Sequence, residues 1–422
     1  MFENFIDILK EELVPALGCT EPIAIAYAAA KARVVLGEMP DSMTAHCSGN
    51  IIKNVKGVTV PSTGNMKGIE TSAILGAVGG DASKELEVLT SVRPEHVEKT
   101  RELLEQKICS VTLAKGVENL FIEITAVKGD KSAVVTIADS HTNIIRILKD
   151  GETIFEKDQR AVSAQKKLDR SNLSVRNIYE FANKVDIEAV KPVLDRQIKC
   201  NMEIANEGMH NKYGAAVGQT LTKHFSEDIT TKAKAYTAAG SDARMSGCVL
   251  PVVINSGSGN QGMTVSIPVI VYAEHIGAPE EKLYRALTLS NLLAIHQKTG
   301  IGKLSAYCGA VSAACAAGAA IAYLHDEPFE VIKDTLTNSL ANVSGIVCDG
   351  AKPSCAAKIA SSLDAAIMAY MMAKEGDRFS PGEGLVTADI EKTIKNIGLM
   401  AKEGMKETDV EILTLMISEK QE

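Results

Sequence analysis

The hydrophobic pattern of the chain changes once, after about Ser171, and this change limits the possible folds. From about Ser42 to Phe155, short β-branched runs alternate with Gly, Asn, Asp and Lys, as in strands joined by turns. After Ser171 the apolar residues recur with a helical period and strand patterns almost vanish. The expected strand segments are "SMTAHCSGNIIKNVKGVTVP", "LEVLTSV", "KICSVTLAKG", "LFIEITAVKG", "SAVVTIAD" and "NIIRILKDG".

These patterns predict an α+β fold with a mainly helical body and an inserted mixed α/β sheet domain. Residues 1–40 contribute N-terminal helices to the helical body, with helices expected at 3–13 and 20–37. Residues 41–165 form the inserted domain, an antiparallel-leaning sheet with helices in "GIETSAILGAVGG" and "RPEHVEKTRELLEQK". Residues 171–422 form the helical domain, which also contains the three cysteines that we expect to bind a metal cluster.

Six further segments of the helical body carry the helical period. They are "VRNIYEFANKVD", "EAVKPVLDRQIKCNMEIANEGM", "EEKLYRALTLSNLLAIHQKT", "EPFEVIKDTLTNSLANVSG", "SCAAKIASSLDAAIMAYMMAKEG" and "TADIEKTIKNIGLMAKEGM". The segment from Cys308 to Leu324 is rich in Ala and Gly and at the short limit for a membrane span, so we interpret it as a helix buried in the core.

The charge balance restricts the partners of the protein. With 45 Lys and Arg against 53 Asp and Glu, the formal net charge is −8, and no basic stripe indicates a nucleic-acid interface. The first residues are acidic and amphipathic, unlike a secretory signal. We therefore expect a cytoplasmic protein that binds a small molecule rather than nucleic acid or membrane. Its small-residue helices also suit packing between chains, as in a homodimer.

Nine cysteines are many for such a compartment. Their odd number and the length of the chain argue against a disulfide framework. Metal binding or catalysis is one explanation, and small buried side chains are another.

Three cysteines lie where loops run into predicted helices. Cys348 and Cys355 flank the loop "CDGAKPSC", with Ser354 a candidate N-cap, and Cys308 opens the Ala/Gly helix 40 residues before Cys348. Helix N-termini favour thiolates, so the three suit an iron–sulfur cluster. Cys315 follows Cys308 by seven residues, about 10.5 Å along one helix, so we assign it to the core. Three ligands leave one iron open as a Lewis acid.

The motif "GCTEP" places Cys19 at the start of a helix, where Thr20 is a candidate N-cap. The helix field should lower the pKa of the Cys19 thiol, which would make its thiolate a general base or nucleophile. The alternative is a small residue that only fills the helix entry.

Polar loops supply candidate substrate-binding residues. "INSGSGNQGM" contains Ser256, Ser258 and Asn260, whose polar groups could hold a carboxylate, and Arg244 just upstream offers a guanidinium fork. The loop matches neither a P-loop nor a dinucleotide fingerprint. "ADSHTNI" adds Ser140 and His141, and "GNIIKNVKG" adds Asn54, which would face a site at the domain boundary. For Arg244 the alternative is an ordinary surface ion pair, and for His141 it is a structural role.

Together, "LGCTEP", "SGNIIKNVKGVTVPSTG", "DARMSG", "INSGSGNQG", Cys308 and "CDGAKPSCAAKIA" resemble the L-cysteine desulfidase family. That family is related to the α domain of iron–sulfur L-serine dehydratases. The resemblance covers essentially the whole chain. It implies an oxygen-sensitive [4Fe–4S] cluster held by Cys308, Cys348 and Cys355, with Cys19 as the general base. It also implies conversion of L-cysteine to sulfide, ammonia and pyruvate without pyridoxal phosphate.

Two other functions remain open at this stage. The same machinery could act on L-serine, because an open iron accepts a hydroxyl as well as a thiol. A non-enzymatic iron–sulfur redox sensor would use the same thiols, with Cys47 or Cys248 as resolving partners.

Overall fold

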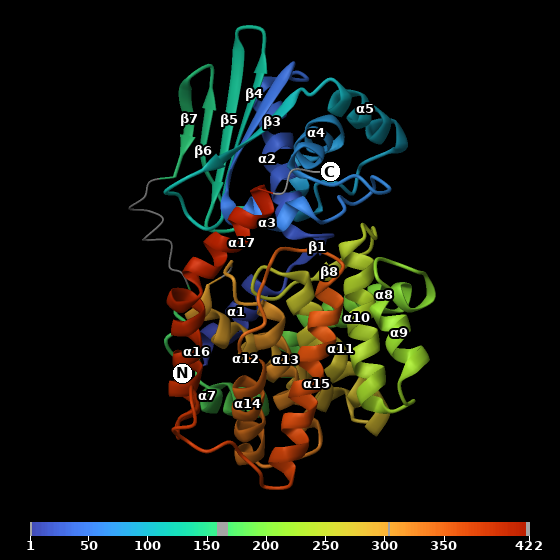
Figure 1. Cartoon of the computed structure of the whole chain (residues 1–422), viewed down its shortest axis with the longest axis vertical. Helices are drawn as coiled ribbons and strands as arrows, with labels where there is room; N and C mark the ends of the chain where they lie inside the picture. Colours follow the sequence, from blue (N-terminus) through green and yellow to red (C-terminus); the bar gives the residue numbers. More distant parts are fainter. Residues whose placement is uncertain (1, 158–167, 303, 419–422) are drawn as a thin grey trace.

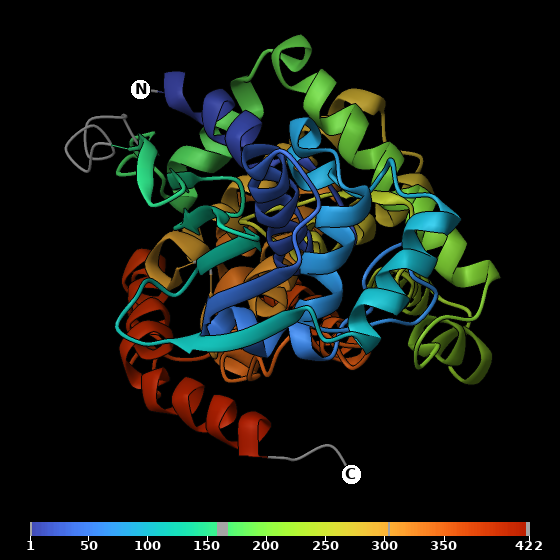
Figure 2. The same ribbon diagram turned by 90° about the horizontal axis from the view of Figure 1, so that it is seen from above.

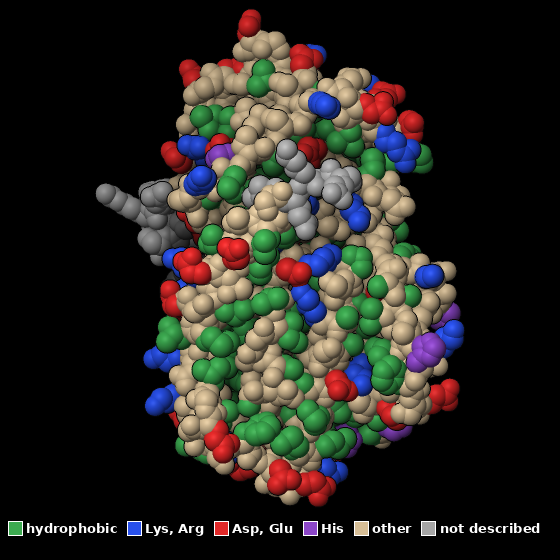
Figure 3. Space-filling model, viewed as in Figure 1, with side chains coloured by type: hydrophobic (Ala, Val, Ile, Leu, Met, Phe, Trp, Pro, Cys, Tyr) green, Lys and Arg blue, Asp and Glu red, His purple; other side chains and the backbone are tan. Residues whose placement is uncertain are grey.

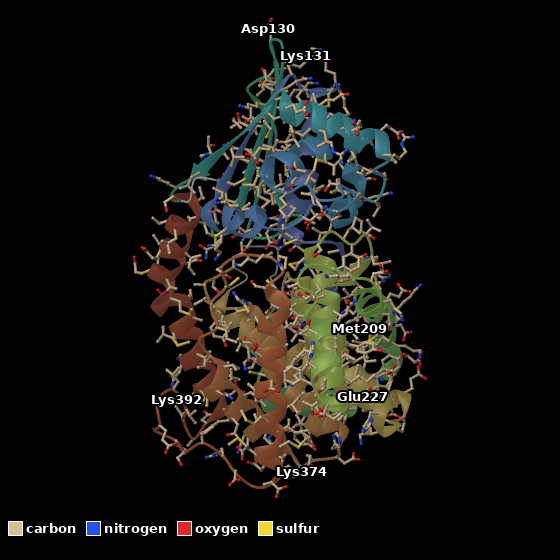
Figure 4. The ribbon with its side chains drawn as sticks, turned by 45° about the vertical axis from the view of Figure 1, so that its right-hand side comes forward. Asp130, Lys131, Met209, Glu227, Lys374 and Lys392 are labelled. Carbon is tan, nitrogen blue, oxygen red and sulfur yellow. The ribbon has the colours of Figure 1, made fainter. Side chains whose placement is uncertain are left out.

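The computed structural model describes residues 2–157, 168–302 and 304–418, and it has an α+β fold. A sheet with its own helices lies at one end of the molecule, and a larger helical body lies at the other (Figure 1). Figure 4 marks these ends: Asp130 and Lys131 lie at the tip of a hairpin of the sheet, and Lys374 lies far away at the end of a long helix. The predicted fold class is confirmed.

The sheet has six strands in the order β3-β2-β4-β5-β6-β7. They are β2 (Ser42–Ser48), β3 (Cys109–Ala114), β4 (Phe121–Lys128), β5 (Lys131–Ala138), β6 (Ile144–Lys149) and β7 (Glu152–Glu156). Only β2 and β3 are parallel, so the predicted antiparallel tendency is confirmed. The cross-strand pairs Ile122–Ile137 and Ile124–Val135 are fully buried, which explains the apolar alternation along β4 and β5.

One expected strand segment is wrong and another is wrong in part. "LEVLTSV" begins within a 3-10 turn, η1 (Ala82–Glu87), because the Asp81 carboxylate accepts a hydrogen bond from the backbone of Ser83 and caps that turn. "SMTAHCSGNIIKNVKGVTVP" forms a strand only as far as Ser48 and then a helix, α3 (Gly49–Lys56). The β-branched content of these segments reflects burial rather than strand formation.

Three other helices accompany the sheet: α2 (Thr20–Leu36), α4 (Ile69–Gly79) and α5 (Pro94–Glu105). The helix α2 packs on α4 and on strands β4 and β5. A Cβ at Gly76 would lie 2.3 Å from the Ala26 carbonyl oxygen, so the small residues of α2 and α4 permit this close approach.

The helical body contains the remaining helices. They are α1 (Glu3–Glu12), α7 (Val175–Lys184), α8 (Ile187–His210), α9 (Val217–His224), α10 (Ile229–Met245), α11 (Gly259–Ile276), α12 (Glu280–Ile301), α13 (Gly309–Leu324), α14 (Phe329–Val343), α15 (Cys355–Lys374), α16 (Ile390–Leu399), a π-helical turn η2 (Met400–Gly404) and α17 (Lys406–Ser418). The six predicted helical segments are confirmed, whereas α9, α10, α11 and α17 were not anticipated.

The Ala/Gly segment forms α13, which is buried between α11, α12, α14 and α15 as predicted. None of the helices in the described ranges is long and apolar enough to cross a membrane.

The division of the chain at 1–40, 41–165 and 171–422 stays a prediction, and residue 165 itself lies outside the described ranges. The helix α1 contacts α8 and α12 of the body, whereas α2 lies on the sheet. Between them, strand β1 (Pro15–Leu17) pairs with β8 (Pro251–Val253). Beyond this pairing, the Thr20 hydroxyl at the start of α2 donates to the Gly257 carbonyl just before α11, so the two helix starts lie side by side.

The helix α17 connects the two ends of the molecule and lies at its periphery in Figure 2. Its Asp409 pairs with the buried Lys53 of α3 and accepts a hydrogen bond from Asn50 at 2.8 Å. In the body, α15 exposes Met368 and Met371, and Figure 3 shows hydrophobic side chains gathered over this part of the surface. The homodimer stays a prediction.

Candidate active site

One cavity gathers side chains from four helix N-termini. Its lining includes Cys19 and Glu21 at the start of α2, residues 257–261 at the start of α11, residues 308–310 at the start of α13, and Cys355 and Ile359 of α15. Asn54 of α3, Arg244 and Lys298 complete its polar wall. Since helix N-termini carry unpaired N–H groups and positive partial charge, their convergence favours an anionic occupant.

Backbone pairing places the three predicted ligands together in this cavity. Tyr307 and Val347 form an antiparallel bridge, with the Cys308 amide donating to the Ile346 carbonyl at 3.0 Å and the Cys348 amide to the Ala306 carbonyl at 2.6 Å. Cys355 opens α15 after a loop that returns to the same wall. Burial, together with the nearby Cys348 and Cys355, raises the pKa of Cys308 to about 12. Cys315 lies further along α13 and does not line the cavity.

Two buried cations face the cavity. Arg244, in the last turn of α10, is 2% exposed, and Lys298, in the last turn of α12, is 5% exposed. Neither has a carboxylate partner within the described part of the chain. Burial lowers the pKa of Lys298 to about 8, although Cys348 and Cys308 act to raise it. A buried cation without a counter-ion is costly, so this wall also favours an anion.

Cys19 lies at the start of α2, as its motif predicts, and it is the N-cap of that helix. The expected direction of its pKa shift is wrong. Burial raises the pKa of the Cys19 thiol well above its usual value, and the Glu21 carboxylate raises it further, while Arg244 opposes them. The thiol donates a hydrogen bond to Glu21 Oε2 at 3.0 Å. Thr20 does not cap the helix, since its hydroxyl donates to the Gly257 carbonyl at 3.0 Å. Burial and Glu21 outweigh the helix field, so the thiol is neutral in this cavity.

Glu21 is an ionised carboxylate at the centre of a hydrogen-bond network. Its oxygens accept bonds from Cys19, from the Thr20 hydroxyl at 3.1 Å and from the Asn54 amide at 3.3 Å. His141 Nε2 lies 3.7 Å from Glu21 Oε1. Burial alone would raise the pKa of Glu21, but His141 and the Cys19 hydrogen bond outweigh it and lower the pKa to about 2. His141 and Asn54 therefore influence the site by contacting the Glu21 carboxylate.

The glycine-rich loop and Arg244 form one unit. Arg244 Nε donates to the Gly18 carbonyl at 3.0 Å, and Nη1 donates to Asn260 Oδ1 at 3.1 Å. A Cβ at Gly259 would lie 2.4 Å from Arg244 Nε, so only glycine admits the guanidinium here. Ser258 is the N-cap of α11 and lines the cavity.

Three predicted residues, Ser256, Ser140 and His141, lie outside the cavity lining, and His141 acts on it only through Glu21. The Ser256 hydroxyl donates to Asn255 Oδ1 at 2.9 Å, in a residue with φ of +50°, so it shapes the loop. Ser140 belongs to a turn whose carbonyl accepts from the Asn143 amide at 3.1 Å. Its neighbour His141 lies beside Glu21 instead.

Sequence reasoning missed Glu21, Lys298 and Gln261. Glu21 stands two residues after Cys19 in the motif already singled out, so its proximity was a usable signal. Lys298 carries no such signal, because it ends a long helix far from the cysteines in sequence. Gln261 is revealed by packing, since a Cβ at Gly309 would lie 2.5 Å from its amide carbon.

The donor set fits an iron–sulfur cluster better than a single metal ion. Among the residues that the structure describes, no group of three His, Cys, Asp or Glu side chains is arranged to hold one ion. A cubane instead takes each thiolate on a different iron, so its ligands are more widely spaced. An iron–sulfur cluster with thiolate ligands is anionic. It suits this cavity because the three thiols, the unpaired Lys298 and the helix N-termini all line it.

Comparison with known proteins agrees with this geometry. The model of the serine dehydratase alpha chain family matches residues 83–414. The chain is 56% identical to the UPF0597 protein of Lachnoclostridium phytofermentans, over 99% of this chain and 100% of that protein. It is 52% identical to the UPF0597 protein of Desulfitobacterium hafniense, over 99% and 97% of the two chains, and 48% identical to that of Treponema denticola, over 99% and 98%. The family match includes the three clustered cysteines, and the relatives extend over the N-terminal motif as well.

Proposed function

Because the chain belongs to the serine dehydratase alpha chain family, we propose that it is an iron–sulfur lyase acting on a small β-substituted amino acid, with L-cysteine as its substrate. The reaction is β-elimination of L-cysteine, which with one water gives sulfide, ammonia and pyruvate. The observation that supports this proposal most strongly is the convergence of Cys19, Cys308, Cys348 and Cys355 on one cavity with unpaired cations.

In this proposal Cys308, Cys348 and Cys355 hold a [4Fe–4S] cluster, and pyridoxal phosphate has no part. When bound, the cluster supplies a Lewis-acidic iron that weakens the bond between Cβ and its leaving group. The carbonyl of Gly350 and the surrounding backbone fix the ligand loop, and Lys298 balances the negative charge of the thiolates beside it. Loss of the cluster would leave the Lys298 ammonium group buried without a negative charge beside it.

Cys19 then removes the Cα proton of the substrate. Because the buried thiol starts neutral, it first passes its proton to Glu21 Oε2, which accepts its hydrogen bond, and the departing sulfide later takes that proton up. The Arg244 guanidinium favours the resulting thiolate. Breaking the Cα–H and Cβ–S bonds gives aminoacrylate, which hydrolyses to pyruvate and ammonia. Arg244, Asn260 and Ser258 hold the carboxylate of the substrate near the N-terminus of α11. An aligned, water-poor cavity makes these contacts stronger than they would be in solution.

L-Serine is the second candidate substrate, and the name of the matching family model favours it. The two substrates differ only in the atom that leaves Cβ. We propose L-cysteine because the motifs around Cys19 and the cysteine spacing resemble the desulfidases.

The test is an oxygen-free assay of iron-reconstituted protein with L-cysteine and L-serine in parallel. Sulfide and pyruvate in equal amounts from L-cysteine, with kcat/KM well above that for L-serine, support the desulfidase. Pyruvate from L-serine alone would assign the protein to the dehydratases. An intact cluster without turnover of either would refute the lyase.

A further inference from the structure

Two opposite charges flank Cys19 in the cavity wall. On one side the Glu21 carboxylate accepts the thiol hydrogen bond at 3.0 Å. On the other side the Arg244 guanidinium donates to the Gly18 carbonyl, directly before Cys19, at 3.0 Å. Both side chains line the cavity, and both are more than nine-tenths buried. A ligand in contact with both would therefore lie against the Cys19 sulfur.

Neither charge is neutralised by a hydrogen-bonded partner of opposite sign in the described ranges. The donors to Glu21 are a thiol, a hydroxyl and an amide, all neutral, and the nearest basic side chain is His141, with Nε2 at 3.7 Å from Oε1. Arg244 commits Nε and Nη1 to a carbonyl and an amide oxygen. Its remaining N–H groups have no partner there, although a guanidinium has five donors. Buried charges are normally paired. Arg244 therefore lacks an anion, and the one basic side chain beside Glu21, His141, lies beyond hydrogen-bond distance.

We propose that Glu21 binds the α-ammonium group and Arg244 the α-carboxylate group of the substrate, so that the cavity selects free α-amino acids. This inference rests on the proposed function and names the residues that recognise its substrate class. In an α-amino acid both groups are bonded to Cα, so a molecule held at both ends presents Cα to the intervening Cys19. Its side chain is then directed to the remaining wall, where Cys308, Cys348 and Cys355 lie.

Lys298 has a different role from Arg244 in the cavity. Its charge acts on Cys348 and Cys308, whereas Arg244 acts on Cys19. The two cations therefore act on different thiols, and Arg244, which contacts the residue before Cys19, is the one we place with Glu21 around a shared ligand. The specific alternative is that His141 is the sole counter-ion of Glu21. In that case Glu21 orients the site and takes no part in recognising the ammonium group.

The experiment uses iron-reconstituted protein without oxygen and measures protection of Cys19 from iodoacetamide by mass spectrometry. The probe is L-alanine, an α-amino acid without a leaving group, compared with propionate, which lacks the ammonium, and ethylamine, which lacks the carboxylate. We expect L-alanine to protect at concentrations about 10- to 100-fold lower than either analogue, as for loss of one charged hydrogen bond.

In Glu21→Gln the preference for L-alanine over propionate should fall to about twofold or less. Glu21→Asp should restore part of it, which a merely structural role would not do. Arg244→Met should remove the preference over ethylamine instead. The matched control is Glu391→Gln, another glutamate beside a histidine, His296 at 2.7 Å, but outside the cavity; it should keep the wild-type preferences.

An unchanged preference for L-alanine over propionate in a folded Glu21→Gln protein would overturn the inference and favour His141 as the counter-ion. Equal protection by all three probes in the wild type would overturn it as well. These outcomes are independent of turnover. A protein that binds L-alanine through Glu21 but eliminates neither L-cysteine nor L-serine would refute the proposed function and leave this inference standing.

Discussion

Replacing Gly350 with alanine should displace the loop that carries two of the three proposed cluster ligands, Cys348 and Cys355. Gly350 has a φ of +98°, and a Cβ there would lie 2.3 Å from the backbone oxygen of Lys53. A side chain in left-handed backbone costs about 1–2 kcal/mol, and overpacking typically costs about 1–3 kcal/mol. Lys53 belongs to α3 and cannot move away as a flexible side chain would. The free energy of unfolding should therefore fall by about 2–5 kcal/mol.

The assay is urea unfolding of the iron-free protein, followed by iron analysis after oxygen-free reconstitution. Besides the loss of stability, we expect Gly350→Ala to retain less than half of the wild-type iron, because the loop that holds Cys348 and Cys355 must shift away from α3. Gly345→Ala is the matched control, since no heavy atom lies within 4 Å of a Cβ there and its φ is not in the left-handed region. Wild-type stability and iron content in Gly350→Ala would refute the reasoning.

Three further predictions concern single side chains. Cys308→Ser should lose most of its iron and its visible absorption on reconstitution, whereas Cys315→Ser, on the same helix but outside the cavity, should keep both; equal iron in the two variants would remove Cys308 from the ligand set. Cys19→Ser should bind iron like the wild type but lose at least about 100-fold in kcat, as expected for removal of a general base; retained turnover would contradict that role. Burial raises the pKa of Asp242 from 3.8 to about 6, so the folded protein holds a proton there that the unfolded chain releases, and this contribution to stability is lost as the pH rises through that window. The stability of Asp242→Asn relative to the wild type should therefore rise by about 1–3 kcal/mol between pH 4 and pH 7 in urea unfolding, and a flat difference would contradict the shift.

The sequence predicts the architecture well where local patterns decide it. The period of the apolar residues identifies most strands and helices, because it records which face is buried. It fails at "LEVLTSV", where the Asp81 cap and the packing of a short turn override β-propensity. It also fails for α11, whose first residue, Gly259, leaves room for Arg244.

For the candidate site, spacing brings out the cysteines but not their surroundings. Loop-to-helix junctions suffice to select Cys19, Cys308, Cys348 and Cys355, because helix starts are local features. The charge of Lys298 and the neutral state of the Cys19 thiol depend on burial and on contacts between distant segments. The helix-start argument predicts a lowered pKa for Cys19 because it omits the burial of the thiol and, after that, the carboxylate of Glu21.

We propose that turnover depends on a cluster held by Cys308, Cys348 and Cys355, which line the same cavity as Cys19. The most direct measurement is the rate of sulfide release from L-cysteine, without oxygen, in preparations of graded iron content. We expect the rate of sulfide release to be proportional to bound iron, with one pyruvate formed for each sulfide and no turnover after the iron is removed by a chelator. Sulfide release from the iron-free protein, or none from the fully reconstituted one, would contradict it.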